Sequence, residues 1–465
     1  MDGRTAARLG LALAILLGGA TVVAGALGTE TGSATRAADL QAGDRIAPPS
    51  GATTVVATDS NTWLGKGSDG PRAEAELFAV GPGGELVYYN DTHTRYWDVD
   101  PIPGTEATVE YVYADHLNAS DCGGESVCTR NGVERVNLTT GEVTSVFSRV
   151  TPGKHSTRWH DADRIDDSRL SVADIGNDRV FVVNTTTGIV EWSWNAQSEF
   201  SVTDSGGPYP EDWTHLNDVE VLDDGRLMAS LRNHDQVVFL DRETGLIENW
   251  TLGEDGAHGI VYEQHNPDYI GPEDGGPSVL VADSENDRVI EYHRSGGNWE
   301  RTWTWRDDEL AWPRDADRLP DGGTLVTDSN GNRVLEVAEN GSVVWEMDVA
   351  FPYEAERLDT GDESTGGPAR NGTNPGTGPE MTAVAGGTAT PDDDADDEDG
   401  SLLGSLGSGP LVNAVRYVLP VWMGGPEILG LAVASLAALL WIALEWRWSS
   451  LGVTVRSPVG LERRR

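Results

Sequence analysis

A short stretch of the chain, residues 213–236, gathers side chains whose types and spacing suit anion chemistry. Two runs of alternating apolar and polar residues flank the turn signal Asp-Asp-Gly at 223–225, which predicts a β-hairpin. Antiparallel pairing about that turn places Arg232 across from Asn217, to within one residue, with His215 beside them. A guanidinium, an amide and an imidazole at one strand end predict a pocket for a tetrahedral oxyanion.

A repeated pattern provides the elements that must position these residues. Four similar units begin at Trp159, Thr214, Ala257 and Pro313. Each unit has four short β-like runs, separated by a turn like DDG, a turn like N-D-R and a T-G or N-G turn. Four antiparallel strands repeated at roughly 40 to 55 residues are typical of propeller blades.

Two weaker units, at 75–99 and 108–149, precede these four. The chain is therefore predicted to be an all-β protein, a six-bladed β-propeller of four-stranded antiparallel blades over residues 55–350. Insertions in the early units leave five or seven blades open, and a β-sandwich is the alternative fold.

The register of the repeat adds further basic residues to the predicted pocket. The first strands of four successive units begin with His160, His215, His258 and Arg314. Because the first strand of each blade lines the central channel, equivalent positions should converge at one rim. A positive funnel in an acidic protein is costly unless it binds an anion, so Arg314 is interpreted as a substrate-binding residue.

The alternative interpretation is that such polar residues only brace neighbouring blades. Aspartates follow three of the basic positions, at Asp163, Asp218 and Asp317. Others end second strands and are interpreted as bracing groups: Asp174, Asp283 and Asp328. Four histidines outside this register are predicted to be loop residues: His155, His234, His265 and His293.

The motif DWTHLNDVEV…SLRNHDQVV resembles the core motif of the arylsulfotransferases, the aryl sulfate:phenol sulfotransferases that do not use PAPS. The resemblance covers about residues 150–350 and implies a six-bladed propeller. The family's motif histidine and asparagine correspond to His215 and Asn217, and its arginine corresponds to Arg232. The chain leaves no room for the separate N-terminal β-domain of the bacterial enzymes, and its C-terminal anchor is extra.

The resemblance also implies roles for individual residues. The histidine of the preceding blade corresponds to His160, within WHDADRI, and the histidine that is sulfated during turnover corresponds to His258, within AHGIVY. Neutral His258 would attack sulfur and release a phenol, while Arg232, His160 and Asn217 hold the sulfuryl oxygens. His215 would protonate the leaving phenolate and then deprotonate the acceptor phenol. Small aryl sulfates and phenols are the implied partners, with no cofactor and no metal.

Three other functions are open at this level. The runs NTTTGIVEW and LDRETGLIENW resemble the blade motif of quinoprotein propellers, although those usually have eight blades. A surface-anchored propeller could use the same basic residues for binding alone. A metal site built from His160, His215 and His258 is the third alternative.

The composition indicates the environment of the protein. The 465-residue chain has a formal net charge of −43, and its only lysines are Lys66 and Lys154. An acidic surface poor in lysine suggests a halophilic protein, since salt screens self-repulsion. The charge argues against nucleic acid as a partner, because phosphates would be repelled.

Two apolar segments predict attachment to a membrane. Residues 1–28 fit a signal peptide or signal anchor, and residues 426–446 approach the roughly 20 residues of a transmembrane helix. Arginines precede the first segment and follow the second, in a basic tail at 447–465. The positive-inside rule therefore predicts a cell-membrane protein whose propeller faces the outside.

Smaller features agree with an extracellular location. Seven Asn-X-Ser/Thr sequons lie between the apolar segments, which would make the protein a glycoprotein. Cys122 and Cys128 are the only cysteines and are predicted to form a local disulfide. Residues 359–408, rich in Gly, Thr, Pro and Asp, are predicted to be a disordered acidic linker.

Overall fold

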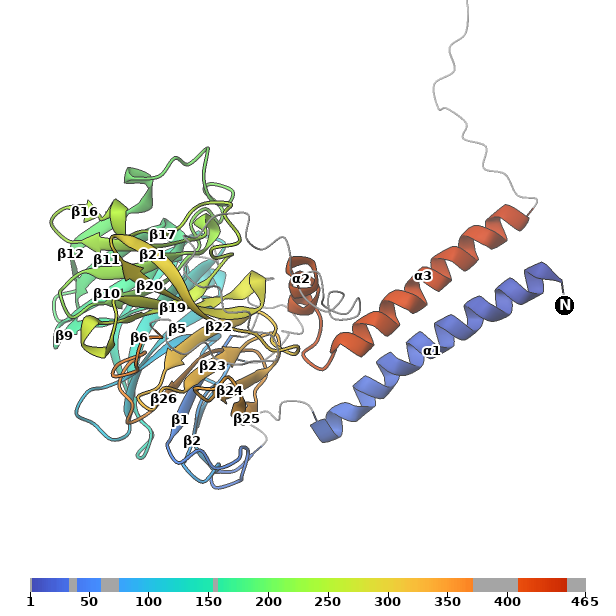
Figure 1. Ribbon diagram of the computed structural model, residues 1–465, viewed down its shortest axis with the longest axis horizontal. Coiled ribbons are helices and arrows are strands. Elements are labelled where there is room, and N and C mark those ends of the chain that lie inside the picture. Colours follow the sequence, from blue (N-terminus) through green and yellow to red (C-terminus); the bar gives the residue numbers. More distant parts are fainter. Residues whose placement is uncertain (1, 33–39, 60–74, 154–157, 371–408, 450–465) are drawn as a thin grey trace, which may run out of the picture. The chain divides into compact units, whose positions relative to one another are not determined.

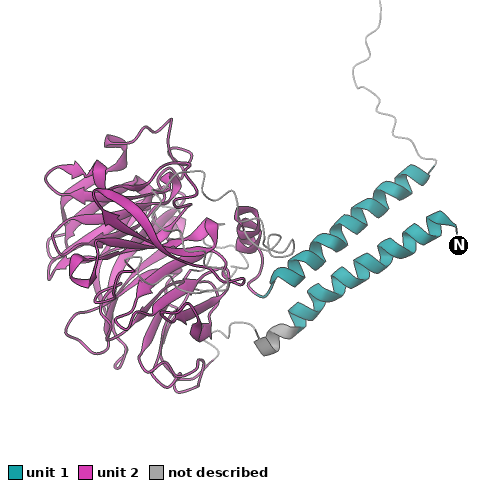
Figure 2. Cartoon of the chain, viewed as in Figure 1, with its two compact units in different colours: residues 1–32, 422–465 teal, residues 33–421 magenta. Residues whose placement is uncertain are grey.

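The computed structural model describes residues 2–32, 40–59, 75–153, 158–370 and 409–449. The chain forms two compact units, one of residues 33–421 and one of residues 1–32 with 422–465 (Figure 2). Both lysines, His155 and the last sequon, at Asn371, lie outside the described residues.

The larger unit is a six-bladed β-propeller, as the repeat predicts (Figure 1). Five blades use consecutive strands, which follow one another from the channel outward. The first of them has β4 (Arg95–Pro101), β5 (Thr108–Leu117), β6 (Cys128–Asn137) and β7 (Glu142–Pro152). The next has β8 (Trp159–Asp161) with β9 (Arg164–Asp166), then β10 (Arg169–Asp174), β11 (Arg179–Asn184) and β12 (Ile189–Asn195), and the third has β13 (Leu216–Val221), β14 (Leu227–Leu231) and β15 (Gln236–Asp241) with β16 (Gly245–Leu246) and β17 (Leu252–Gly253). The last two have β18 (His265–Ile270), β19 (Ser278–Asp283), β20 (Arg288–Ser295) and β21 (Asn298–Trp305), and β22 (Pro313–Arg318), β23 (Thr324–Asp328), β24 (Arg333–Val337) and β25 (Val343–Asp348).

The sixth blade joins the two ends of the propeller. Its strand order is β26 (Pro352–Arg357), β1 (Thr54–Thr58), β2 (Leu77–Val80) and β3 (Leu86–Asn90). The innermost strand therefore comes from the C-terminal side and pairs with β1, which closes the ring. The expected end of the propeller at residue 350 leaves this strand out, because its pairing partner lies far away in sequence.

Apolar side chains between adjacent sheets form the core. Met228 and Phe239 of one blade, for example, pack with Val281 and Tyr292 of the next. Because the first strands of successive blades contact one another, β4, β8, β13, β18, β22 and β26 surround the central channel.

Two segments beyond the blades also pack on the propeller. Ser364 accepts a hydrogen bond from the backbone N–H of Arg318, and Arg370 is 7% exposed. The predicted linker is therefore wrong for residues 359–370, while 371–408 lie outside the described residues. Helix α2 (Pro410–Val418) docks through Asn413, whose side chain donates to Asp287.

The smaller unit consists of helices α1 (Gly3–Gly32) and α3 (Gly425–Trp448). Within the described part of the chain, these two helices are long and apolar enough to cross a membrane. They pack against each other, with Arg8 paired to Glu445. A Cβ atom on Gly18 would lie 2.3 Å from the carbonyl oxygen of Gly430, so this close approach requires glycine.

Candidate active site at the channel rim

A β-bulge at the start of each innermost strand positions the rim of the channel. In four blades the strand pairing skips one residue of the inner strand, and the skipped residues are His160, Asn217, Arg314 and Tyr353. The pairing is also shifted after Tyr96 in β4 and after His265 in β18. A bulge re-aims a side chain and breaks the alternation of a strand. We call the six residues at this level the rim tier: Trp97, His160, Asn217, His265, Arg314 and Tyr353.

The observed register differs from the predicted one. His160 and Arg314 are equivalent, but Asn217 takes the position expected for His215. His215 lies two residues earlier, where the backbone is left-handed with a φ of 46°, as it is at Glu263 and Trp312 in the next two blades. The prediction for His258 is wrong in register, and His265, predicted to be a loop residue, opens β18 instead.

Side chains of the rim tier contact one another across the channel. The Nδ1 atom of His160 lies 3.1 Å from the hydroxyl of Tyr353, and its ring stacks on Trp97 at 4.1 Å between centroids. The guanidinium of Arg314 lies over the ring of Tyr353, at 4.7 Å. The ring of His215 meets that of His160 edge-on at 5.5 Å. The inferred convergence of His160, His215 and Arg314 is therefore observed.

Several buried polar atoms here have no hydrogen-bond partner among the residues that the structure describes. They are Nε2 of His160, Oδ1 of Asn217, and the Nε atoms of Arg158, Arg232 and Arg314. Such atoms are costly to bury unless a ligand or water pairs with them. Four of these five atoms are nitrogens of histidine or arginine, so the unpaired groups are mainly N–H donors that lack a hydrogen-bond acceptor.

Positive charge dominates the electrostatics of the rim. Burial, and then the nearby charge of Arg95, lower the pKa of Arg158 to about 10. Burial, followed by Arg158 and His215, lowers the pKa of His160 well below its usual 6.5. Asp59 offsets part of this charge, since it pairs with Arg314 at 3.3 Å and also with Arg95. His160 is consequently neutral at physiological pH.

His215 forms a dyad with Asp212. Its Nδ1 lies 2.7 Å from Oδ1 of Asp212, so the Nδ1–H donates to the carboxylate and Nε2 keeps its lone pair. Burial lowers the pKa of His215, Asp212 opposes this, and Arg232 lowers it further. The arrangement suits a general acid–base, since the carboxylate fixes the tautomer and steadies the protonated form.

His265 is held by a serine instead of a carboxylate. The hydroxyl of Ser284 donates to the carbonyl of Pro313 at 2.6 Å and lies 2.8 Å from Nδ1 of His265. With its proton already committed, the hydroxyl accepts from Nδ1–H, which leaves a lone pair on Nε2. Burial lowers the pKa of His265 well below 6.5, and the charges of Arg314 and Arg232 lower it further. His265 is therefore neutral, and a hydrogen bond to the backbone of Glu263 partly opposes the lowering of its pKa.

A pocket of about 440 Å³ contains Arg232 and His258. Arg232 lies in a 3₁₀ turn (Arg232–His234) after β14 and pairs with Glu263. His258 lies in a turn before β18 and is 49% exposed. Its ring stacks on Tyr262 at 3.7 Å, and its Nε2 is 3.3 Å from Asp235. Arg232 therefore borders both regions, since its charge also acts on His215 and His265, whereas His258 lies in the open pocket.

Below the rim, the same strands carry two acidic tiers. The first consists of Asp98, Asp161, Asp218, Asn266, Asp315 and Glu354; the second consists of Asp100, Asp163, Glu220, Asp268, Asp317 and Glu356. Many of these carboxylates brace adjacent blades, as when Glu220 accepts the N–H of Tyr269. Burial and the neighbouring Asp161 raise the pKa of Asp163 to about 7.

A larger pocket, of about 760 Å³, lies elsewhere on the propeller and includes His93. Both ring nitrogens of His93 already face carboxylates, Asp115 at 3.2 Å and Glu134 at 3.1 Å. These partners raise its pKa to about 9 against the effect of burial. His93 is a structural ion pair, and we place the candidate active site at the rim.

Sequence reasoning missed Trp97, Arg158, Asp212, His265 and Tyr353. A repeated motif could have found three of them, Trp97, His265 and Tyr353: a variable residue followed by acid-X-acid, with Asn266 replacing the first acid in one copy. It reads WDVD at 97–100, HDAD at 160–163, NDVE at 217–220, HNPD at 265–268, RDAD at 314–317 and YEAE at 353–356. The motif marks every innermost strand, including the closing one.

Comparison with known proteins points to the same region. Residues 158–269 match the family model described as arylsulfotransferase (ASST). No curated protein shows significant similarity to the chain. The matched segment contains five of the predicted site residues: His160, His215, Asn217, Arg232 and His258.

Solved structures resemble the chain at low sequence identity. A protein of unknown function from Bacteroides caccae is 12% identical with a TM-score of 0.45, covering 67% of this chain and all (100%) of that one. A periplasmic gluconolactonase from Pseudomonas aeruginosa is 14% identical with a TM-score of 0.42, over 66% of this chain and 99% of that one. A virginiamycin B lyase from Staphylococcus aureus is 7% identical with a TM-score of 0.38, over 67% of this chain and 88% of that one.

Proposed function

We propose that this protein is a sulfotransferase of the arylsulfotransferase family, which moves a sulfuryl group from an aryl sulfate to a phenol through a sulfated histidine. The observation that carries the proposal is the set of buried, unpaired His and Arg nitrogens at the rim, inside the segment that matches the family model. A sulfuryl group has three charged oxygens, which arginine and imidazole donors can bind.

The nucleophile must be a neutral histidine that reaches the bound sulfur. The resemblance assigns this role to His258, but the geometry favours His265, which belongs to the rim tier and is 2% exposed. A sulfated His265 would be shielded from water, whereas a sulfated His258 would be open to hydrolysis. In the transfer, a bond forms between Nε2 and sulfur as the bond from sulfur to the aryl oxygen breaks.

The remaining residues stabilise charge and move protons. Arg232 and Arg314 bind the sulfuryl oxygens through their unpaired Nε–H groups, and His160 donates or accepts through its unpaired Nε2. Asn217, whose Nδ2 donates to Gln264, offers its unpaired Oδ1 as an acceptor beside them. Protonated His215 gives its proton to the leaving phenolate. In the second half-reaction neutral His215 removes the proton of the acceptor phenol, and the acceptor oxygen displaces the histidine from sulfur.

We also propose that α1 and α3 hold the propeller at the outer face of the cell membrane. Their apolar length and the arginines outside them support this placement. The close packing of α1 on α3 favours an uncleaved anchor over a removed signal peptide. The disulfide between Cys122 and Cys128 agrees with an oxidising location.

The deciding experiment traps the intermediate. The full chain is mixed with a chromogenic aryl sulfate without acceptor, quenched, digested and examined by mass spectrometry for a sulfated histidine. Sulfation of the peptide containing His265 or His258 supports the proposal and selects between them. If the protein binds the aryl sulfate tightly but releases no phenol, it is instead a non-catalytic binding module.

A further inference from the structure

Two carboxylates of the second acidic tier brace the neighbouring blade, and Asp317 does not. Asp163 and Glu220 each accept a backbone N–H from the next blade, those of Val221 and Tyr269. Asp317 occupies the equivalent position in β22 and is 2% exposed. Neither of its oxygens has a hydrogen-bond partner in the described part of the chain. Blade packing therefore does not explain this residue.

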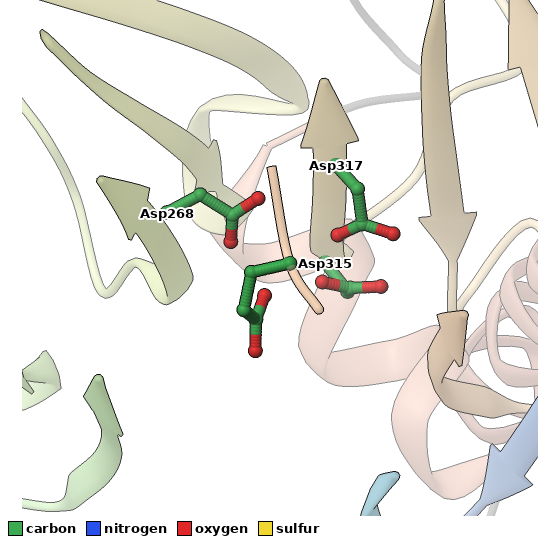
Figure 3. Close-up of side chains that lie close together, drawn as sticks. Asp268, Asp315 and Asp317 are labelled. Atoms are coloured by element: carbon green, nitrogen blue, oxygen red, sulfur yellow. The ribbon is translucent and has the colours of Figure 1, made fainter. Parts of the chain in front are cut away.

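Three other carboxylates surround Asp317. One oxygen each from Asp268, Asp315, Asp317 and Glu363 lie within 4.8 Å of one another. Figure 3 shows the side chains of Asp268, Asp315 and Asp317 gathered in one space, from two neighbouring innermost strands. The Oδ1 atoms of Asp268 and Asp315 also lack partners among the described residues. Each of these three aspartates thus contributes an oxygen to the cluster and carries an oxygen without a partner.

The two arginines whose charges act on this group are ion-paired with other acids. Arg318 directs its guanidinium to Glu291 at 2.8 Å, and Arg357 directs its own to Glu336 at 2.6 Å. Glu356, a fifth carboxylate that acts electrostatically on Asp317, has an unpaired Oε2 of its own. Buried negative charge without a partner is strongly unfavourable, so these acids must either hold protons or share a cation.

We propose that Asp268, Asp315, Asp317 and Glu363 bind a Ca²⁺ ion inside the propeller channel. Carboxylates are hard oxygen ligands that select Ca²⁺ or Mg²⁺ over softer metals. Because Ca²⁺ binds oxygens at about 2.3–2.6 Å, opposite ligands lie up to about 5 Å apart, which is compatible with four oxygens within 4.8 Å of one another. Mg²⁺ usually keeps several waters and is held by one or two carboxylates, so a group of four carboxylates favours Ca²⁺.

The ion would connect parts of the chain that belong to different elements. Asp268 comes from β18, Asp315 and Asp317 come from β22, and Glu363 comes from the segment 359–370 that follows the last blade. That segment is also tied to Asp268 by the hydroxyl of Ser364. Ca²⁺ therefore stabilises the docked segment and the junction of two blades. This role is independent of the proposed sulfotransferase activity.

The test measures metal content and affinity on the full chain in detergent. After exposure to Ca²⁺ and dialysis, elemental analysis should find bound calcium, and calorimetric titration with Ca²⁺ alone should show a saturable site. Asp317→Asn should weaken that site by about 10-fold or more, and Glu363→Gln should do the same without altering any blade strand. Glu220→Gln, a buried acid of the same tier outside the cluster, is the matched control and should bind normally.

Thermal unfolding with and without a chelator completes the design. Chelation should lower the unfolding midpoint of the wild type and of Glu220→Gln by a few degrees, and should have little effect on Asp317→Asn or Glu363→Gln. Absence of calcium in the wild type, or equal calcium binding by the wild type and both cluster variants, would overturn the proposal. So would a higher midpoint of Asp317→Asn than of the wild type in saturating Ca²⁺, since the acids would then be held neutral by protons.

Discussion

The rim tier and the second acidic tier lie on the same six strands, three residues apart, yet they have opposite character. The rim has six positions filled by Trp, His, Asn, His, Arg and Tyr, whereas the second acidic tier has only Asp or Glu. Two of these acids, Asp163 and Glu220, accept a backbone N–H of the neighbouring blade, which is a structural role. The varied rim residues leave nitrogens unpaired, which indicates recognition of an anion. The repeated strands fix where these side chains lie, and the rim residues that differ from blade to blade provide the groups suited to chemistry.

Removal of the proposed nucleophile should have the largest effect on activity and tests the role of the rim most directly. His265→Ala should lower sulfuryl transfer by at least about 1,000-fold, because the covalent route is lost. His258→Ala should cost less than about tenfold, since His258 belongs to the open pocket. Rates with a chromogenic aryl sulfate and a phenol acceptor measure both. The reverse pattern would return the role to His258.

Removing charge from the rim should have the next largest effect. Arg232→Ala should reduce kcat/KM by about 100- to 1,000-fold, since a preorganised donor to the sulfuryl oxygens disappears. Arg232→Lys keeps the charge but not the planar fork and should recover part of the loss. Steady-state kinetics of the two variants separate charge from geometry. Equal activity of Arg232→Ala and wild type would mean that the arginine does not contact the substrate.

The dyad of Asp212 and His215 predicts the pH dependence. The pKa of His215 is lowered in the folded protein, so the neutral base persists as the pH falls to 6.5, and acceptor-limited rates should decline only below that value. Asp212 opposes the lowering, so Asp212→Asn should shift the decline to still lower pH and cut the rate by about tenfold or more. A shift to higher pH, seen in pH–rate profiles, would contradict the assignment.

The smallest expected effect comes from the acidic tier. Glu220→Gln should change the transfer rate less than about twofold, because Glu220 braces the Tyr269 backbone and makes no rim contact among the described residues. The same kinetic assay measures it beside Arg232→Ala. A large loss of activity would show that the two tiers are functionally coupled.

The repeat in the sequence was sufficient to predict the fold, since alternation and turn signals act over a few residues. It also singled out His160, Asn217, Arg232 and Arg314 as candidate site residues, because each belongs to a motif that is contained within one blade. The first blade boundaries and the closing strand β26 were not predictable in this way. Their pairing joins residues from opposite ends of the propeller, and no local pattern records which ends meet.

The sequence by itself therefore determined the propeller fold, the acidic character and the types of side chain available for chemistry. Only the tertiary structure decided which of them meet. A single-residue bulge in each inner strand moves the side-chain register by one, which re-aims Asn217 into the rim. His265 opens β18, whereas His258 lies in the turn before that strand and stays outside the rim. The same packing gathered carboxylates from β18, β22 and the segment after the last blade. Such convergence depends on ring closure, which brings residues together regardless of their separation along the chain.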